Sequence, residues 1–317
     1  MKNVSRRNFL KSSVASAVGA ASVLSVPDLL GAPRGPHMKF PVAPRERLGA
    51  TTWTFRMYLE SPTNRWRDPR LPGMALKDFP AMVAAKFDLH NVELLADHFP
   101  STGKAYLWEL REAVEKAGSH IIDIAVGATA SFYDPFAVKR QEAIDYGKKW
   151  IDVAVAAGSP SVRLHIAGAK GVAPDADRAA ESLKQVAAYG AQHNILVNLE
   201  NDDLVTEDAF FIVRTIDKVQ DPYLRALPDF ANSMLSDNAA FNYDAMALMF
   251  RHAYNISHMK DSEVGGHDKL YTVNVERIFK IAEAAGYRGY YSLEWEGRGG
   301  AYEGTRKLLA ESLKFLG

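Results

Sequence analysis

Short runs of apolar, β-branched and aromatic residues recur from Leu48 to the C-terminus, separated by longer segments of mixed polarity. Runs of this length and composition predict buried strands. In the segments between them, apolar residues recur at spacings of three and four, which predicts helices. The eight predicted strands are Leu48–Thr54, Asn91–Leu95, Ile121–Val126, Ser161–Ile166, Ile195–Glu200, Leu224–Asp229, Tyr254–Met259 and Tyr290–Glu294.

Two of the predicted helices have clear ends. The apolar series that begins at Leu107 stops before Gly118, and the series that begins at Ile278 stops before Gly286. Glycine is common just past a helix end because it adopts a left-handed conformation without strain. Eight strands that alternate with helices over about 270 residues predict a single-domain (β/α)8 TIM barrel spanning residues 48–317. A doubly wound open sheet is the rival fold, but no glycine-rich dinucleotide loop follows the first predicted strand.

The overall composition narrows the class of protein. Hydrophobic residues make up 47% of the 317 residues and charged residues 24%, so the chain has enough apolar surface for one large core. Because 38 basic residues balance 38 acidic ones and no basic block lies outside the N-terminus, we expect no nucleic-acid partner. The absence of cysteine excludes disulfides, thiolate metal sites and a cysteine nucleophile.

The N-terminal residues differ in character from the rest of the chain. Residues 5–11 read SRRNFLK and precede a mildly apolar run rich in Ala, Ser and Val, so the segment resembles a twin-arginine export signal. The run is too short and too weakly apolar for a membrane span. We expect residues 1–32 to be a signal segment of a periplasmic or secreted protein, with an uncleaved, membrane-tethered form as the alternative. Four prolines in residues 33–47 predict a linker or an extended arm.

Polar residues gather at the ends of the predicted strands. In a barrel of this kind, side chains alternate between the interior and the helix layer, and active sites lie at the C-terminal strand ends. Residues of one parity at these ends should therefore converge on one rim. The residues concerned are Glu93, Arg163, His165, Asn198, Glu200, Asp229, His258, Lys260, Ser292 and Glu294.

Each of these residues also has a structural explanation when it is taken alone. Asp229 suits a turn, His258 suits a hydrogen-bonded core position, and Arg163 with His165 suits a structural pair. Taken together, however, three carboxylates and one histidine from the last four strands would leave a buried cluster of uncompensated negative charge. A divalent cation compensates such a charge.

Four short motifs follow one another at these strand ends: LEN at 199–201, DFAN at 229–232, HMKD at 258–261 and SLEWEG at 292–297. In this order they resemble the xylose-isomerase-like superfamily of sugar and sugar-phosphate isomerases and epimerases. The resemblance runs from Leu48 to the C-terminus. It implies that one divalent metal ion, manganese first and zinc, magnesium or cobalt as alternatives, is bound by Glu200, Asp229, His258 and Glu294.

The predicted ligand set favours a particular chemistry. Three carboxylates and one imidazole suit a hard or borderline ion with open positions for a substrate carbonyl and its neighbouring hydroxyl. Such a Lewis acid stabilises the enediolate that forms when the carbon between them loses its proton. The resemblance implies that Glu200 and Glu294 serve as base and acid on opposite faces of the substrate. The expected function is a metal-dependent sugar isomerase or epimerase.

Further residues are expected to contact the sugar. Asn232 stands where relatives often carry histidine, which leaves the identity of the sugar open. Lys260 is expected to stabilise a developing oxyanion, with an ion pair to Asp261 as the alternative explanation. The full set of predicted substrate contacts is Asn232, Lys260, His165, Arg163, Glu93 and His267.

Three other functions compete with the isomerase. A lyase that cleaves 3-keto glycosides would use the same metal site, and a noncatalytic sugar-binding barrel would keep the pocket without proton exchange. An abasic-site endonuclease shares the barrel, but it needs three zinc ions and more histidines than these strand ends offer. The expected partner is a small sugar or keto sugar, with membrane contact only through an uncleaved signal. A homo-oligomer is compatible with the sequence.

Overall fold

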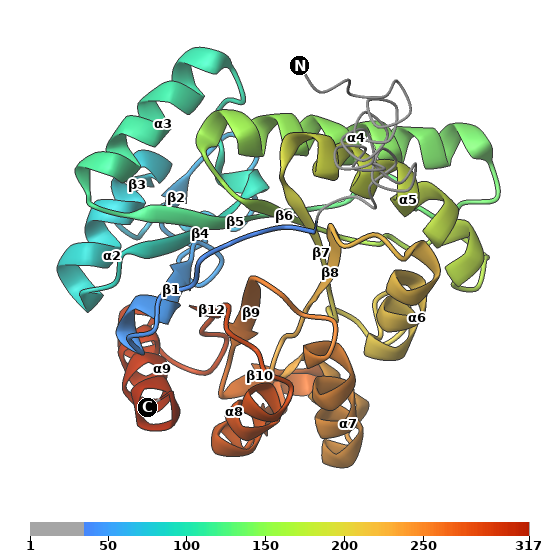
Figure 1. Ribbon diagram of the computed structural model, residues 1–317. Coiled ribbons are helices and arrows are strands. Elements are labelled where there is room, and N and C mark those ends of the chain that lie inside the picture. The colour runs from blue at the N-terminus through green and yellow to red at the C-terminus, as the bar shows by residue number, and fades with distance from the viewer. Residues whose placement is uncertain (1–34, 317) are drawn as a thin grey trace, which may run out of the picture. The chain divides into compact units, whose positions relative to one another are not determined.

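The computed structural model describes residues 35–316, which form a ring of eight parallel strands surrounded by helices (Figure 1). The strands are hydrogen-bonded in the order β8-β7-β6-β5-β4-β1-β12-β9. Two isolated bridges, Ala226 with Ala253 and Asp229 with His258, join β8 to β9 and nearly close the ring. The predicted (β/α)8 barrel is confirmed. Its strands are β1 (Leu48–Thr51), β4 (Asn91–Leu95), β5 (His120–Val126), β6 (Ser161–Leu164), β7 (Leu196–Glu200), β8 (Leu224–Leu227), β9 (Ile256–Met259) and β12 (Tyr290–Leu293).

Helices follow the strands along the chain and lie outside the ring (Figure 1). No helix among residues 35–316 is long and apolar enough to cross a membrane. The α-helices are α2 (Phe79–Phe87), α3 (Lys104–Lys116), α4 (Ala137–Ala157), α5 (Ala176–His193), α6 (Ala209–Val219), α7 (Ala239–Phe250), α8 (Val275–Ala284) and α9 (Ala301–Phe315). Short 3-10 turns are η2 (Arg45–Arg47), η3 (Leu76–Asp78), η4 (Ala96–His98), η5 (Asn232–Ser236) and η6 (Gly266–Asp268).

Local sequence signals fix the helix ends. Asp208 caps α6, where its carboxylate accepts hydrogen bonds from the first free backbone N–H groups, and Asn238 caps α7 in the same way. The predicted ends of α3 and α8 are confirmed, because Gly118 and Gly286 adopt φ of 61° and 74° just beyond them.

Several predicted strands run about two residues past the observed ladder. The backbone leaves the ladder after Thr51, Leu164, Leu227 and Leu293, so the polar residues that follow lie in the first turn of each loop. Two small additional sheets lie in the loops after β1 and β9. A parallel pair joins β2 (Leu59–Glu60) to β3 (Met74–Ala75), and an antiparallel hairpin joins β10 (Ser262–Val264) to β11 (Leu270–Thr272).

The described part of the predicted arm, residues 35–47, is tied to the barrel. The hydroxyl of Tyr254 accepts a hydrogen bond from the backbone N–H of Met38 and donates one to the carbonyl of Pro36, at 3.1 and 2.8 Å. Phe40 packs edge to face on Tyr254 and Tyr290. Because these tyrosines lie at the start of β9 and β12, the arm covers the N-terminal end of the barrel. The predicted signal segment, residues 1–32, lies outside the described residues.

Candidate metal centre and active site

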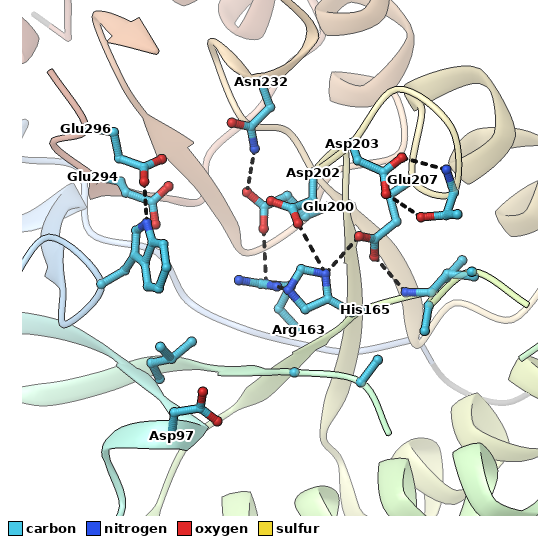
Figure 2. Close-up of a pocket in the computed structure, with 18 of the residues that line it drawn as sticks. Asp97, Arg163, His165, Glu200, Asp202, Asp203, Glu207, Asn232, Glu294 and Glu296 are labelled. Carbon is cyan, nitrogen blue, oxygen red and sulfur yellow. Dashed lines mark hydrogen bonds and ion pairs between the residues drawn. The ribbon is translucent and has the colours of Figure 1, made fainter. Parts of the chain in front are cut away.

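A cavity of about 910 Å³ lies at the C-terminal ends of the barrel strands. Its lining is strongly polar, and Figure 2 shows carboxylates, an arginine and a histidine facing one another across it. Among the residues predicted from the sequence, those that line it are Arg163, His165, Glu200, Asn232, Lys260 and Glu294.

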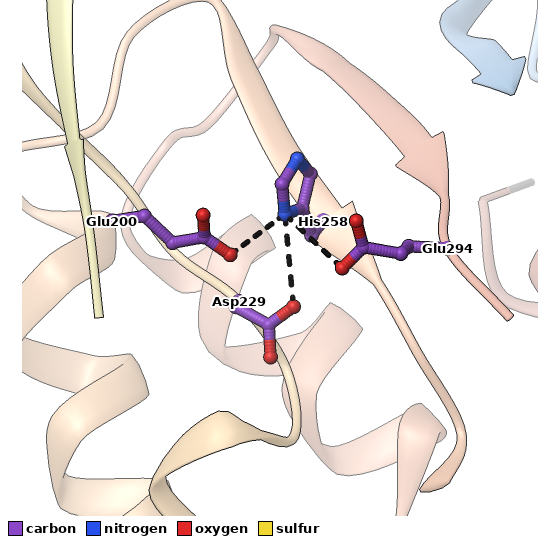
Figure 3. Close-up of side chains that lie close together, drawn as sticks. All are labelled: Glu200, Asp229, His258 and Glu294. Carbon is purple, nitrogen blue, oxygen red and sulfur yellow. Dashed lines mark hydrogen bonds and ion pairs between the residues drawn. The ribbon is translucent and has the colours of Figure 1, made fainter. Parts of the chain in front are cut away.

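Four buried side chains meet next to this cavity, and two of them, Glu200 and Glu294, line it (Figure 3). Glu200 ends β7, Asp229 follows β8, His258 lies in β9, and Glu294 follows β12. Nδ1 of His258 lies 2.8 Å from Glu200 Oε1, 3.7 Å from Asp229 Oδ2 and 3.5 Å from Glu294 Oε2. Because one ligand atom from each residue lies within 4.8 Å of all the others, this cluster is able to hold a metal ion.

Two buried carboxylate oxygens of the cluster make no hydrogen bond to any described residue and have only a protein cation nearby. Oδ1 of Asp229 accepts hydrogen bonds from two backbone N–H groups, whereas its Oδ2 is buried with no hydrogen-bond partner among residues 35–316. Oε2 of Glu200 also makes no hydrogen bond in the described chain, although it lies 3.1 Å from Nε of Arg163, just as Asp229 Oδ2 lies 3.4 Å from Nζ of Lys260. Buried carboxylate oxygens are costly unless something compensates them. Three oxygen donors and one imidazole nitrogen suit manganese, magnesium, cobalt or zinc.

Glu93 fixes the orientation of the histidine. Its two carboxylate oxygens lie 2.9 and 3.0 Å from Nε2 of His258, so Nε2–H is the donor there, while Nδ1 faces the cluster and lies 2.8 Å from Glu200 Oε1. Metal-bound histidines commonly donate their second ring N–H to a carboxylate in this way. Glu93 is fully buried and does not line the cavity, so the structure places this predicted substrate contact behind His258 instead.

The electrostatics of the cluster reflect crowded negative charge. Burial raises the pKa of Asp229 to about 8, and the neighbouring carboxylates of Glu200 and Glu294 add to the rise while Lys260 opposes it. Burial also opposes ionisation of Glu200, but the attraction of His258 and Arg163 outweighs it and lowers the pKa of that carboxyl. A bound dication would relieve the same crowding.

Lys260 lies beside the cluster. Its ammonium group is 2.9 Å from Glu294 Oε2 and 3.0 Å from Glu263 Oε2, and it donates to Asn232 Oδ1 at 3.0 Å. Burial alone would lower the pKa of this lysine, but the surrounding carboxylates raise it well above its ordinary value. The alternative explanation for Lys260, an ion pair with Asp261, is wrong, because Asp261 pairs with Lys307 at 2.5 Å.

A second group of side chains extends from the cluster along the cavity wall (Figure 2). Arg163 Nε lies 3.1 Å from Glu200 Oε2, and the same guanidinium contacts His165. Nδ1 of His165 lies 2.8 Å from Glu207 Oε2, while Glu207 Oε1 accepts the backbone N–H of Ile166 at 2.6 Å. Both oxygens of Glu207 therefore have hydrogen-bond partners within the protein.

His267 is not brought to the cavity. It lies exposed in η6, at the tip of the β10–β11 hairpin, and the hairpin holds that turn away from the cavity lining. Sequence reasoning also missed cavity residues. Trp53, Trp66 and Glu207 line the cavity from loops, and Glu263 lines it from β10. Only Trp53 carried a usable signal, because it lies near the end of the first predicted strand, Leu48–Thr54.

A protein-family model described as a xylose isomerase-like TIM barrel matches residues 81–317. The chain belongs to this family. A comparison with curated proteins finds no match.

Solved structures share the fold at low sequence identity. D-psicose 3-epimerase from Clostridium cellulolyticum H10, crystallised with D-tagatose, superposes with a TM-score of 0.65 at 15% identity, over 85% of this chain and 99% of that one. A xylose isomerase domain protein from Planctomyces limnophilus gives 0.59 at 20% identity, over 85% and 94%. The 3-keto-D-glucoside 4-epimerase from E. coli gives 0.59 at 13% identity, over 84% and 99%.

Proposed function

We propose that the protein is a metal-dependent sugar epimerase or isomerase that transfers a proton at a carbon next to a carbonyl. The observation that carries the proposal is the placement of two carboxylates around one histidine. Glu200 and Glu294 approach His258 from opposite sides, with oxygens 2.8 and 3.5 Å from its Nδ1 (Figure 3). Membership of the xylose isomerase-like family supports this reading. The twin-arginine-like N-terminus supports a periplasmic or secreted location.

The proposed metal site uses the four clustered side chains. Glu200, Asp229, His258 and Glu294 would hold one divalent ion, with manganese as the first candidate. When bound, such an ion polarises the substrate carbonyl and makes the neighbouring C–H bond more acidic. Glu93 accepts Nε2–H of His258, so that Nδ1 is the ring nitrogen that would bind the ion.

The side chains of the cluster carry the proton transfer. One of Glu200 and Glu294 takes the carbon-bound proton, and the other returns a proton to the opposite face of the same carbon. The ammonium group of Lys260, 2.9 Å from Glu294, stabilises negative charge that develops on the carbonyl oxygen. Asn232, Arg163 and His165 line the cavity and are the proposed contacts to sugar hydroxyls.

A second candidate is cleavage of a 3-keto glycoside. Removal of the proton at C2 by the same carboxylate would leave an electron pair that forms a C1–C2 double bond as the C1–O bond breaks. The leaving oxygen must then receive a proton. The His165–Glu207 pair on the cavity wall favours this candidate, because an imidazole held by a buried carboxylate is a suitable proton carrier. Release of a free alcohol from a 3-keto glycoside would identify the lyase.

Single substitutions test the acid/base assignment. Glu200→Gln and Glu294→Gln each remove a basic carboxylate, so turnover of a keto sugar or keto glycoside should fall by about a hundredfold or more. Glu112→Gln is the matched control, because Glu112 is exposed on α3. Near-normal turnover in both active-site variants would rule out proton transfer through these glutamates and favour a hydride shift between neighbouring carbons.

A further inference from the structure

The loop after β1 builds an aromatic wall beside the cluster. Trp53 and Trp66 both line the cavity, and their rings meet edge to face with centroids 5.8 Å apart. Trp53 Nε1 donates to Glu296 Oε1 at 2.5 Å, and the other oxygen of Glu296 accepts from Lys260. Trp53 therefore reaches the innermost part of the site. Trp66 is 44% exposed and continues the aromatic surface toward solvent.

The loop that presents Trp66 is held in place by its own hydrogen bonds. The buried side chain of Asn64 donates to the carbonyls of Arg56 and Leu59, both at 2.7 Å, and accepts the backbone N–H of Trp66 at 3.0 Å. Arg67 donates to three further carbonyls of the loop, those of Met57, Asp68 and Leu71. The β2–β3 pair joins the two ends of the loop. A ligand that packs on Trp66 therefore does not have to order this surface first.

Polar groups surround the outer part of the aromatic wall. The Arg65 guanidinium lies over the Trp66 ring, 5.2 Å from its centroid, Thr63 lines the cavity near it, and Asp97 faces the same space from η4 (Figure 2). The hydroxyl of Thr63 donates to the backbone carbonyl of Asp97 at 2.8 Å, which holds the two segments together. The carboxylate of Asp97 makes no hydrogen bond or ion pair with any other residue in the 35–316 range. It is free to accept from a ligand.

The size of the cavity exceeds what one sugar ring requires. Its volume of about 910 Å³ is near the upper end of the range of about 300–1,000 Å³ that is typical of pockets for drug-sized ligands. A single hexose bound at the cluster would leave the space beside Trp66 empty. An aromatic surface edged by donors and acceptors suits a pyranose, which has an apolar C–H face and a rim of hydroxyls.

We propose that Trp66, with Trp53, Arg65, Thr63 and Asp97, forms a second subsite that takes the neighbouring sugar ring of a glycoside. The true substrate is then a disaccharide or longer glycoside, with its reacting keto ring at the cluster and the adjoining ring packed on Trp66. The inference rests on the proposed function for the position of the reacting ring. It holds for both the epimerase and the lyase.

Direct binding measurements test the subsite. The full chain is titrated with 3-keto-D-glucose and with a panel of disaccharides, each oxidised at C3 of the non-reducing glucose, and tryptophan fluorescence and calorimetry are followed. At least one disaccharide should bind about tenfold more tightly than the single ring. Trp66→Ala should remove that advantage and leave binding of 3-keto-D-glucose unchanged, whereas Trp66→Phe should keep most of it. Trp108→Ala is the control, because Trp108 is exposed on α3 and lies outside the cavity lining.

Two results would overturn the subsite. One is that no disaccharide binds more tightly than the single ring. The other is that Trp66→Ala weakens both kinds of probe equally. The same titrations in Glu200→Gln separate this inference from the proposed function. The subsite stands if disaccharides still bind more tightly than the single ring, and still lose this advantage in Trp66→Ala, even when the acid/base chemistry proves different. The subsite is wrong if the chemistry is confirmed and Trp66→Ala leaves disaccharide binding unchanged.

Discussion

Substitution of Glu93 tests how the metal site is supported. The carboxylate touches His258 from the side opposite the cluster, with both oxygens within 3.0 Å of Nε2, and the side chain is fully buried. In Glu93→Gln an oxygen that accepts the N–H remains but the negative charge is lost. In Glu93→Ala the N–H loses its acceptor inside a buried site, which adds the cost of an unsatisfied donor.

The expected magnitudes follow from these contacts. Partners of this kind contribute about 10- to 100-fold to metal affinity, or about 1.4–2.8 kcal/mol. Because Glu93→Gln keeps an acceptor, we expect a loss of about tenfold, and for Glu93→Ala a loss of about a hundredfold. Neither substitution lies in the substrate cavity, so each should weaken metal binding directly. Turnover should fall only because less metal is bound.

Competition titrations measure the effect. Chelator-treated wild-type and variant proteins are titrated with Mn²⁺ and Zn²⁺ against a chromophoric chelator, and thermal unfolding of the metal-free proteins confirms that the barrel is folded. Glu112→Gln serves as the control for loss of a surface carboxylate. Wild-type affinity in both Glu93 variants would contradict the reasoning, because His258 would then be oriented without Glu93.

Three further predictions concern other buried side chains. His258→Ala should abolish tight metal binding while the barrel still folds, because the ligand lies at the rim and not in the packed layers; elemental analysis and circular dichroism check this. Lys260→Gln should reduce turnover by about a hundredfold without weakening Mn²⁺ binding, because it removes a cation beside the cluster; unchanged turnover would remove Lys260 from the mechanism. Burial, aided by Arg56, lowers the pKa of His98 from 6.5 to about 3, so the native state stays neutral while the unfolded state protonates. As the pH falls below 6.5, protonation of this histidine in the unfolded state lowers the free energy of unfolding, by about 2 kcal/mol at pH 5. The free energy of unfolding of a His98→Phe variant, measured by denaturant titration, should therefore fall by about 2 kcal/mol less than that of the wild type between pH 7 and pH 5.

The sequence predicted the barrel and the four clustered residues for one physical reason. Side chains at β-strand ends have a direction set by parity, and parallel strands of one ring must bring those ends together. Glu200 and Glu294 lie far apart along the chain, yet each sits at a strand end, which the alternation of apolar runs makes recognisable. The position of a residue within a strand can therefore be predicted from the pattern of apolar and polar residues along the chain.

The remaining features depend on information that a pattern does not contain. The alternation of side chains along the strand indicates that Glu93 points into the barrel, but not how deep in the barrel it lies. Its contact with His258 behind the cavity was therefore not predictable. His267 was expected at the site because it follows the seventh strand closely, but the β10–β11 hairpin carries it to an exposed turn. Glu207 and Trp66 reach the cavity from irregular loops whose course is set by local contacts, such as those of Asn64.

The central claim is that a carbon-bound proton of the substrate is exchanged through Glu200 and Glu294. The most direct test is to run the reaction in deuterated water with the metal-loaded protein and to locate deuterium in the product by NMR. The account predicts one deuterium at the reacting carbon with the wild-type protein. It also predicts a partial reaction in the single variants Glu200→Gln and Glu294→Gln. Each should still exchange the carbon-bound proton of the epimer whose base it retains, without converting that epimer into the other. Conversion of the sugar with no solvent deuterium at the reacting carbon would contradict the account.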